Sequence, residues 1–365
     1  MRASLAGWTE SRFDVAWGEV TGAVGDTVTV LPIVVAVAAL TDLSLSHLLL
    51  GFAVFQVVWG LRYGHPMSVE PMKALAALVI AGGLSTGEYV AAGLLAGVTL
   101  LVVGRTGTLA RLAPYVGEPV VRGIQVGVAL ILLRTGVTTG LAAPSLAALA
   151  VVVALVTVVT GHRDVAALAV LGLGAALAVT AAGTITPRLP TPTLLDPATL
   201  SFSRNAVGAT VGQLAMTVGN AAVATSLLVE EYFDADASPD DLSTSMGVMN
   251  LLAVPLGAMP MCHGSGGVAG KYAFGARTAT SNLVLGGLYL VLAVVAVDAV
   301  AAFPMAVLGV VLVLVAIELG RSGVDTEDPL LTGAVGVTAL LVNVGVAFGV
   351  GIVGYHALKR VRGET

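Results

Sequence analysis

Charged residues are scarce in this chain. Asp, Glu, Lys and Arg make up 11% of its 365 residues and hydrophobic residues make up 57%, whereas an average soluble domain carries about 25% charged residues. With so few charges, the chain cannot cover a water-facing surface of the size that its length requires. The composition therefore predicts a membrane protein with several spans and the lipid bilayer as its surroundings.

Cysteine and basic clusters are scarce as well. A single cysteine, Cys262, excludes an internal disulfide and a cysteine metal cluster. The formal charge of −5 and the lack of a basic stripe argue against a nucleic-acid partner, and we expect neither a metal nor a cofactor. Arg2, Glu10, Arg12 and Asp14 precede the first apolar run, so we expect no cleavable signal peptide. The apolar material reaches the end of the chain, which leaves no room for a large soluble domain.

Long apolar runs fill the rest of the chain and predict an all-α polytopic fold. Several runs are shorter than the ~20 residues of a full span, and the last is long enough for two short helices, which gives about fourteen segments. The predicted runs are 20–40, 47–61, 71–83, 88–104, 117–139, 145–160, 165–183, 205–229, 242–258, 265–276, 281–299, 303–319 and 328–355.

The positions of Lys and Arg predict the orientation in a cell membrane. If the N-terminus is cytoplasmic, most basic residues lie on or near the cytoplasmic side, and Arg188 and Arg204 remain outside. This bias predicts an even number of crossings and a cytoplasmic C-terminus. The acidic stretch at 230–241 would then be a solvated cytoplasmic connector.

The chain contains signs of an internal duplication. GAVGDTVTV (22–30) and GATVGQLAMTVGN (208–220) are glycine-bearing apolar segments with one strong polar residue each, Asp26 and Gln213. Each is followed by another apolar segment and then by an interrupted one, PMSVEPMKALAA (66–77) or PMCHGSGGVAGKYAFGART (260–278). Paired interruptions at corresponding places in two halves indicate the binding site of a transporter.

The two interruptions predict extended backbone followed by short helices. Proline and clustered glycine both favour irregular backbone, which is tolerated at membrane depth only where it lines a cavity or is buried in protein. We expect Val69 to Pro71 to be extended, with Pro71 in the first turn of a helix. In the second half, we expect Met261 and Cys262 to be extended and a helix to begin within 264–267.

Two half-helices that point their N-termini at one place create an anion site, because their free N–H groups and positive dipole ends meet there. We predict that amides around Met72–Lys73 and Ser265–Gly267 hold the anion, and that a side chain at Gly266 would crowd it. Lys73, His263 and Lys271 would add side-chain donors. The alternative is that these glycines only allow close helix packing. The predicted binding residues are Ser68, Glu70, Met72, Lys73, Gln213, Asn220, His263, Gly264, Ser265, Gly266 and Gly267.

Two carboxylates within the apolar segments, Asp26 and Glu70, are candidates for carrying a coupling proton, because carboxylates inside a membrane are costly and usually functional. Asp26 shares a helical face with Thr29, and Gln213 shares one with Thr217 and Asn220. For the threonines, hydrogen bonding between helices is the favoured interpretation.

Motifs of soluble enzymes fail on inspection. SGGVAGK (265–271) has Ser265 where a phosphate-binding loop has its first glycine and Tyr272 where the loop has Ser or Thr. Cys262 and His263 could form a thiol nucleophile, but neighbours on an extended chain point to opposite sides.

Several segments resemble signatures of the molybdate transporter family, a branch of the sulfate permease-like superfamily. They are GEVTGAVGDTVTVLP (18–32), YGHPMSVEPMKALAA (63–77), TVGNAAVAT (217–225) and 260–278, and APYVGEPVVRGIQVGVALILL (113–133) resembles the wider superfamily. The resemblance implies two inverted repeats of seven segments, 1–200 and 201–365, with core and gate domains interleaved across both. It also implies an oxyanion held between the third and tenth segments. Glu70 and Lys271 depart from the family pattern, which usually has glutamine at both positions.

The leading functional interpretation is a proton-coupled secondary transporter of a tetrahedral oxyanion, most of all molybdate, and not an enzyme. Sulfate and tungstate are the alternative substrates. An anion channel on the same fold and an enzyme built on Cys262 and His263 stay open as other classes. A nucleobase–proton symporter shares the fold of the superfamily, but the cationic residues and helix N-termini argue against a neutral ring as substrate. A homodimer is an open alternative for the assembly.

Overall fold

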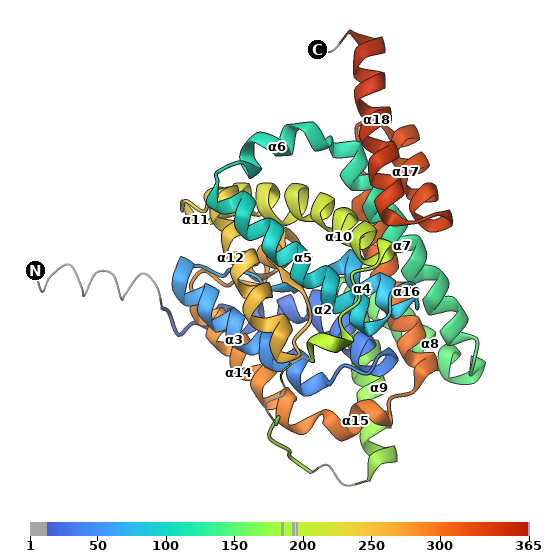
Figure 1. The fold of residues 1–365 in the computed structure, drawn as a ribbon. Helices are drawn as coiled ribbons and strands as arrows, with labels where there is room; N and C mark the ends of the chain where they lie inside the picture. Colours follow the sequence, from blue (N-terminus) through green and yellow to red (C-terminus); the bar gives the residue numbers. More distant parts are fainter. Residues whose placement is uncertain (1–12, 184–185, 192–193, 195, 364–365) are drawn as a thin grey trace, which may run out of the picture.

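The computed structural model describes residues 13–183, 186–191, 194 and 196–363 (Figure 1). The first half contains α2 (Trp17–Leu40), α3 (Leu45–Tyr63), β1 (Glu70–Pro71) with α4 (Lys73–Ile80), α5 (Thr86–Arg105), α7 (Glu118–Gly140), α8 (Pro144–Val159) and α9 (Ala166–Ala182). The second half begins with one continuous helix, which consists of α10 (Arg204–Met216), the π-helix η3 (Thr217–Ala224) and α11 (Thr225–Phe233). It continues with α12 (Pro239–Ala253), β2 (Met261–Cys262) with α13 (Ser265–Ala273), α14 (Thr280–Val295), α16 (Met305–Val324), α17 (Pro329–Leu341) and α18 (Val344–Arg362). The fold is a nearly all-helical polytopic one, as the apolar runs predict.

The helix bounds follow the predicted runs closely, with one addition. Seven helices in the described ranges are long and apolar enough to cross a membrane, and α8, α14 and α17 are shorter apolar helices. The last predicted run is divided, as expected, at Val342 and Asn343, and Asn343 caps α18 by accepting a hydrogen bond from the Val346 amide. The short helix α6 (Leu109–Val116) was not predicted, and the predicted run 281–299 is divided between α14 and the short helix α15 (Val297–Ala301). Arg2 and Arg12, which enter the orientation argument, lie outside the described residues.

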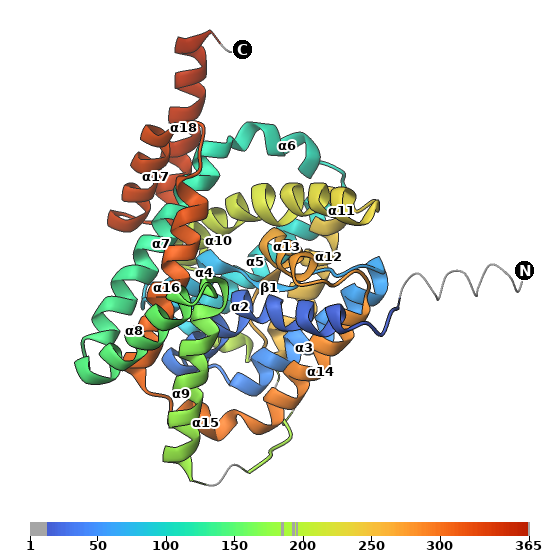
Figure 2. The same cartoon turned by 180° about the vertical axis from the view of Figure 1, so that it is seen from behind.

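The helices form two groups, and each group takes helices from both halves of the chain. In one group α5 packs against α12, α3 against α14 and α2 against α13. In the other, α7 packs against α16 and α17, and α8 packs against α9. Figures 1 and 2 show α7, α8, α16, α17 and α18 gathered on one side, with α3, α12 and α14 on the other. The helices α4 and α10 contact α7 across the boundary between the groups.

The two interrupted segments meet in the interior. β1 and β2 pair antiparallel, with Glu70 opposite Cys262 and Pro71 opposite Met261. Each strand is followed within three residues by a short helix, so the N-termini of α4 and α13 lie beside the same two-stranded ribbon. The prediction of two half-helices that begin near one point is therefore confirmed. One detail was wrong: Pro71 belongs to β1, and α4 begins only at Lys73 after the cap residue Met72.

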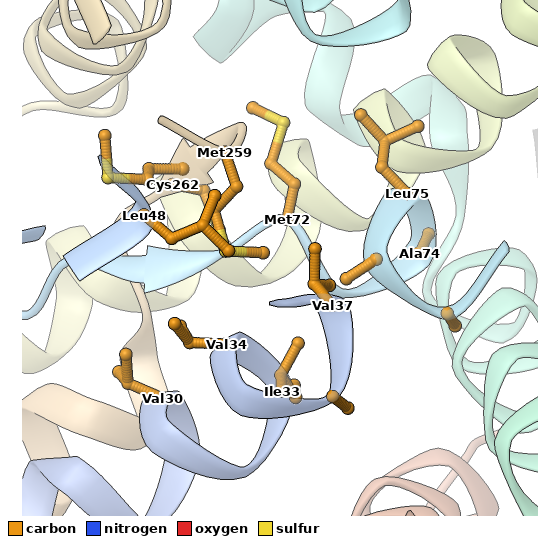
Figure 3. Close-up of a cluster of buried hydrophobic side chains, with 14 of the residues drawn as sticks. Val30, Ile33, Val34, Val37, Leu48, Met72, Ala74, Leu75, Met259 and Cys262 are labelled. Atoms are coloured by element: carbon orange, nitrogen blue, oxygen red, sulfur yellow. The ribbon is translucent and has the colours of Figure 1, made fainter. Parts of the chain in front are cut away.

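Apolar side chains enclose the ribbon (Figure 3). The labelled residues come from α2, from α3 and from the two interrupted segments, and all of them are buried. They satisfy the condition under which irregular backbone is stable at membrane depth, namely burial inside protein. The labelled members are Val30, Ile33, Val34, Val37, Leu48, Met72, Ala74, Leu75, Met259 and Cys262.

Glycines allow the backbones of α7 and α16 to touch. A Cβ atom at Gly309 would overlap the backbone of Gly136 and Gly140, and one at Gly136 would overlap the Gly309 carbonyl. Small residues at such crossings are typical of helix pairs in membranes.

We therefore expect Gly309→Ala to lower the free energy of unfolding by about 1–3 kcal/mol, the usual cost of overpacking. Gly287→Ala is the matched control, because a Cβ atom there meets nothing within 4 Å. Thermal unfolding of both variants in the same detergent measures the difference. Equal midpoints for the two variants would contradict a close α7–α16 crossing.

Candidate functional site: a cavity at the two interrupted segments

A small cavity lies where the interrupted segments approach the continuous helix α10–η3–α11. The cavity is thus formed by elements from both halves of the chain, at the point where two helices begin. Its lining residues are Glu70, Pro71, Lys73, Gln213, Met216, Thr217, Asn220, Ala221, Cys262, His263 and Gly264.

The carboxylate of Glu70 lies at the N-terminus of α13. Its Oε1 atom accepts a hydrogen bond of 2.7 Å from the Gly267 amide, and its Oε2 atom pairs with Lys73 Nζ at 2.6 Å. The Glu70 side chain is 2% exposed and the Lys73 side chain 20% exposed. A protein carboxylate therefore occupies the kind of position that an external anion would take at a helix N-terminus.

Two glycines permit this approach. A Cβ atom at Gly264 or Gly267 would overlap the Glu70 carboxyl group, and at Gly267 it would also overlap Ser68 and Asp26. Gly266 is different, because a Cβ atom there has no neighbour within 4 Å. A side chain at Gly264 or Gly267 would therefore crowd protein groups, whereas one at Gly266 would point to open space, since the first turn of α13 directs Gly266 away from the packed groups.

The N-terminus of α4 is already occupied by a protein side chain. Gln213 Oε1 accepts hydrogen bonds from the amides of Ala74 at 2.9 Å and Leu75 at 3.4 Å, and Gln213 Nε2 donates to Thr217 Oγ1 at 3.1 Å. The Met72 amide donates to the Pro260 carbonyl at 2.9 Å. Met72 therefore does not present its amide to the cavity, and its side chain lies in the apolar cluster of Figure 3. At this helix, Lys73 is the predicted residue that does line the cavity.

The π-helix η3 brings Asn220 to the cavity. Ser265 Oγ donates a hydrogen bond to Asn220 Oδ1, so the first residue of α13 is tied to the middle of η3. π-helical turns occur often at functional sites. Thr217 also lines the cavity, although the sequence favoured a structural role for it. The spacing of Thr217 from Gln213 was the signal that could have placed it here.

Ser68 and Lys271 face Asp26 instead of the cavity. Ser68 Oγ donates to Asp26 Oδ1 at 2.8 Å, and Lys271 Nζ pairs with Asp26 Oδ2 at 3.2 Å. Asp26 and Lys271 are both fully buried. The expectation that Lys271 adds a donor to the anion site is therefore wrong, because its ammonium group is held by Asp26.

His263 lines the cavity, but both of its ring nitrogens have protein partners. Nδ1 lies 2.9 Å from the Ser68 carbonyl and must carry the proton there, because a carbonyl only accepts, and Nε2 lies 2.7 Å from Ser245 Oγ. The Cys262 thiol points to the Pro71 carbonyl at 3.7 Å. Cys262 and His263 thus have separate partners, and the geometry offers no thiol–imidazole pair.

Solved structures with a similar fold are membrane transporters. The transmembrane domain of the cyanobacterium bicarbonate transporter BicA matches with a TM-score of 0.69 and 19% identity, over 92% of this chain and 98% of that chain. Murine Solute Carrier 26 family member A9, described as an anion transporter in the inward-facing state, matches with a TM-score of 0.72 and 13% identity, over 99% of this chain and 72% of that chain. The chain therefore has the multi-pass membrane fold that these proteins share.

Sequence comparison identifies the family. The profile described as "Molybdate transporter of MFS superfamily" matches residues 18–132 and 205–319. Molybdate transporter 2 of Arabidopsis thaliana is 30% identical, over 98% of this chain and 91% of that protein, and Molybdate transporter 1 of Chlamydomonas reinhardtii is 25% identical, over 98% and 94%. The chain belongs to this molybdate transporter family. One matched range lies in each half of the chain. Asp26 follows the start of the first range by as many residues as Gln213 follows the start of the second, so the two residues occupy corresponding positions.

The cap on α4 leads to a prediction. Gln213→Leu leaves the Ala74 and Leu75 amides without their acceptor, which should cost about 1–3 kcal/mol because a buried polar group then lacks a partner. Amide hydrogen exchange within 73–80 should become faster. Gln213→Glu, which keeps the acceptor oxygens, should retain most of the protection. Unchanged exchange in Gln213→Leu would show that Gln213 does not hold this helix.

Proposed function

We propose that the chain is a secondary transporter that moves a tetrahedral oxyanion, molybdate above all, across the cell membrane, with both termini cytoplasmic. The observation that supports this most is the carboxylate of Glu70 held between Lys73 and the Gly267 amide. A site that binds its own carboxylate in this way has the donors that an oxyanion needs. The relatives named as molybdate transporters support the choice of molybdate.

The proposed binding step is an exchange of one anion for another. An incoming oxyanion would take the Lys73 ammonium group and the Gly267 amide from Glu70, and the Ser265 and Asn220 side chains lie beside the same helix start. Glycine at position 267 lets the anion reach the backbone. Gln213 would act as a positioning residue, since it holds the N-terminus of α4.

Charge balance connects this exchange to protons. Without a substrate, Glu70 is balanced by Lys73, and Asp26 is balanced by Lys271. An oxyanion that displaced an ionised Glu70 would add uncompensated negative charge to a buried site, which is costly. Protonation of Glu70 releases Lys73 for the substrate and removes one negative charge. Binding should therefore be favoured at acidic pH, which is the behaviour of a proton symporter, and Asp26 is the second candidate for the coupling group.

Sulfate and tungstate share the tetrahedral shape of molybdate and remain the alternative substrates. Competition of labelled molybdate uptake by sulfate, tungstate and uracil in vesicles tests the choice. Strong competition by uracil would contradict an oxyanion site, and flux that does not saturate would favour a channel.

The cavity is lined within one chain, so a homodimer is not required for binding.

The proton role of Glu70 can be tested by Glu70→Gln. We expect this variant to bind molybdate and to lose most of the increase in uptake between mildly alkaline and mildly acidic pH, because the group that must be protonated is gone. Initial rates of uptake into vesicles over that pH range measure the effect. Glu230→Gln, at an exposed position, is the matched control and should keep the parent profile. A parent-like profile in Glu70→Gln would transfer the coupling role to Asp26.

The cradle can be tested by two neighbouring glycines. We expect Gly267→Ala to weaken molybdate binding by about fivefold or more, because its Cβ atom would take the space beside the amide that the Glu70 carboxylate now fills. If about 1–3 kcal/mol of crowding is lost from binding, the affinity falls by about 5- to 150-fold. Gly266→Ala should bind like the parent, because its Cβ atom meets nothing within 4 Å. Isothermal titration of the purified variants decides, with thermal unfolding to verify folding. Equal affinities would exclude the first turn of α13 as the cradle.

A further inference from the structure

A second polar site lies behind the cavity, around the end of the Lys271 side chain. Its ammonium nitrogen has four oxygen neighbours: Asp26 Oδ2 at 3.2 Å, Gln56 Oε1 at 3.0 Å, the Met67 carbonyl at 2.9 Å and Asn282 Oδ1 at 3.2 Å. These oxygens come from α2, α3, the segment before β1 and α14. The proposed anion exchange uses none of them, and of these groups only Asp26 enters the proposed function, as the second candidate for the coupling group.

The two amide side chains are oriented by other contacts, so their oxygens are directed at the ammonium group. Asn282 Nδ2 donates to the Gln56 carbonyl at 2.9 Å and to the Met67 carbonyl. Gln56 Nε2 donates to Asp26 Oδ2 at 3.2 Å and to the Val69 carbonyl at 3.1 Å. Asn282 Nδ2 also donates to Gln56 Oε1 at 2.8 Å. The two amides therefore hold three of the four oxygens in place, since they donate to Gln56 Oε1, the Met67 carbonyl and Asp26 Oδ2.

The arrangement has the chemistry of a site for a monovalent cation. One carboxylate and three neutral oxygens supply a single negative charge, which matches one positive charge. The contacts of 2.9–3.2 Å are longer than the roughly 2.0–2.6 Å that Mg²⁺ and Ca²⁺ require.

We propose that these oxygens form a binding site for a monovalent cation of ammonium or potassium size, and that Lys271 fills it from within the chain. The protein thereby carries a permanent cation next to Asp26 and needs no dissolved cation at this point. The site lies close to the cavity, since Asp26 and Ser68 both approach Gly267. The proposal depends on the geometry of the site and not on which substrate the cavity binds.

The alternative is an ordinary buried ion pair. In that case removal of Lys271 leaves Asp26 uncompensated and destabilises the protein in every salt. A true cation site behaves differently, because a vacated site of the right size can be refilled from solution. Two variants distinguish these cases: Lys271→Ala vacates the site, and Lys271→Met removes the charge but fills most of the space.

The experiment measures thermal unfolding of the purified full chain in potassium, ammonium or choline chloride at constant ionic strength. We expect Lys271→Ala to unfold at a lower temperature than the parent in choline. Ammonium or potassium should raise that midpoint by about 3 °C or more, growing with the logarithm of the cation concentration, because only the folded state binds. Lys271→Met and the parent should show no such difference between salts. Adding Asp26→Asn to Lys271→Ala should remove the response.

The proposal is overturned if Lys271→Ala responds to ammonium and potassium no more than Lys271→Met does. To guard against loss of folding, all variants are also expressed and purified with ammonium chloride present throughout. Folded Lys271→Ala recovered with ammonium but not with choline would support the site, and failure to recover it in any salt would count against it. Since no transport is measured, a failed cation response leaves the oxyanion proposal to its own tests.

Discussion

Antiparallel pairing of two residues from each half of the chain is the interaction on which the site depends. Without the ribbon of β1 and β2, the Met72 amide and its neighbours would be unpaired backbone inside an apolar core, which is costly. The ribbon satisfies that backbone and at the same time fixes where α4 and α13 begin. The position of the amides that we propose as the anion site thus follows from how the interrupted segments complete their own hydrogen bonds.

Charge in the interior is arranged as two pairs that have different surroundings. Asp26 and Lys271 are fully buried and are surrounded by oriented amides and a hydroxyl group. Glu70 and Lys73 lie on the cavity wall, and Lys73 keeps part of its side chain exposed. The Asp26–Lys271 pair is costly to separate, because removal of either partner leaves an uncompensated buried charge. The second pair can be opened by an anion or a proton at lower cost.

The sequence predicted the segments well because each apolar run is bounded by clear polar or glycine-rich breaks, and even the division of 328–355 followed from its length. Glu70 and the glycines were found because proline and glycine mark irregular backbone. The partners of these residues could not be predicted. Lys271 and Asp26 are separated by 245 positions in the chain, and only packing shows that they form a pair. Which of Gly266 and Gly267 lies against the Glu70 carboxylate depends on the direction in which the first turn of α13 faces, and the spacing of the glycines alone does not define that direction.

The π-helix η3 makes the two halves of the chain differ. A π turn contains more residues than an α turn, so the residues after it are rotated about the helix axis by up to about 100° for each extra residue. The helix can therefore present one face of α10 to α5 and α18 and a different face of α11 to α13. The corresponding segment of the first half, α2, is α-helical from end to end and contains Pro32 but no π turn. The candidate cavity consequently lies beside a helix whose two ends face different neighbours, although the two halves of the chain both match the same family profile.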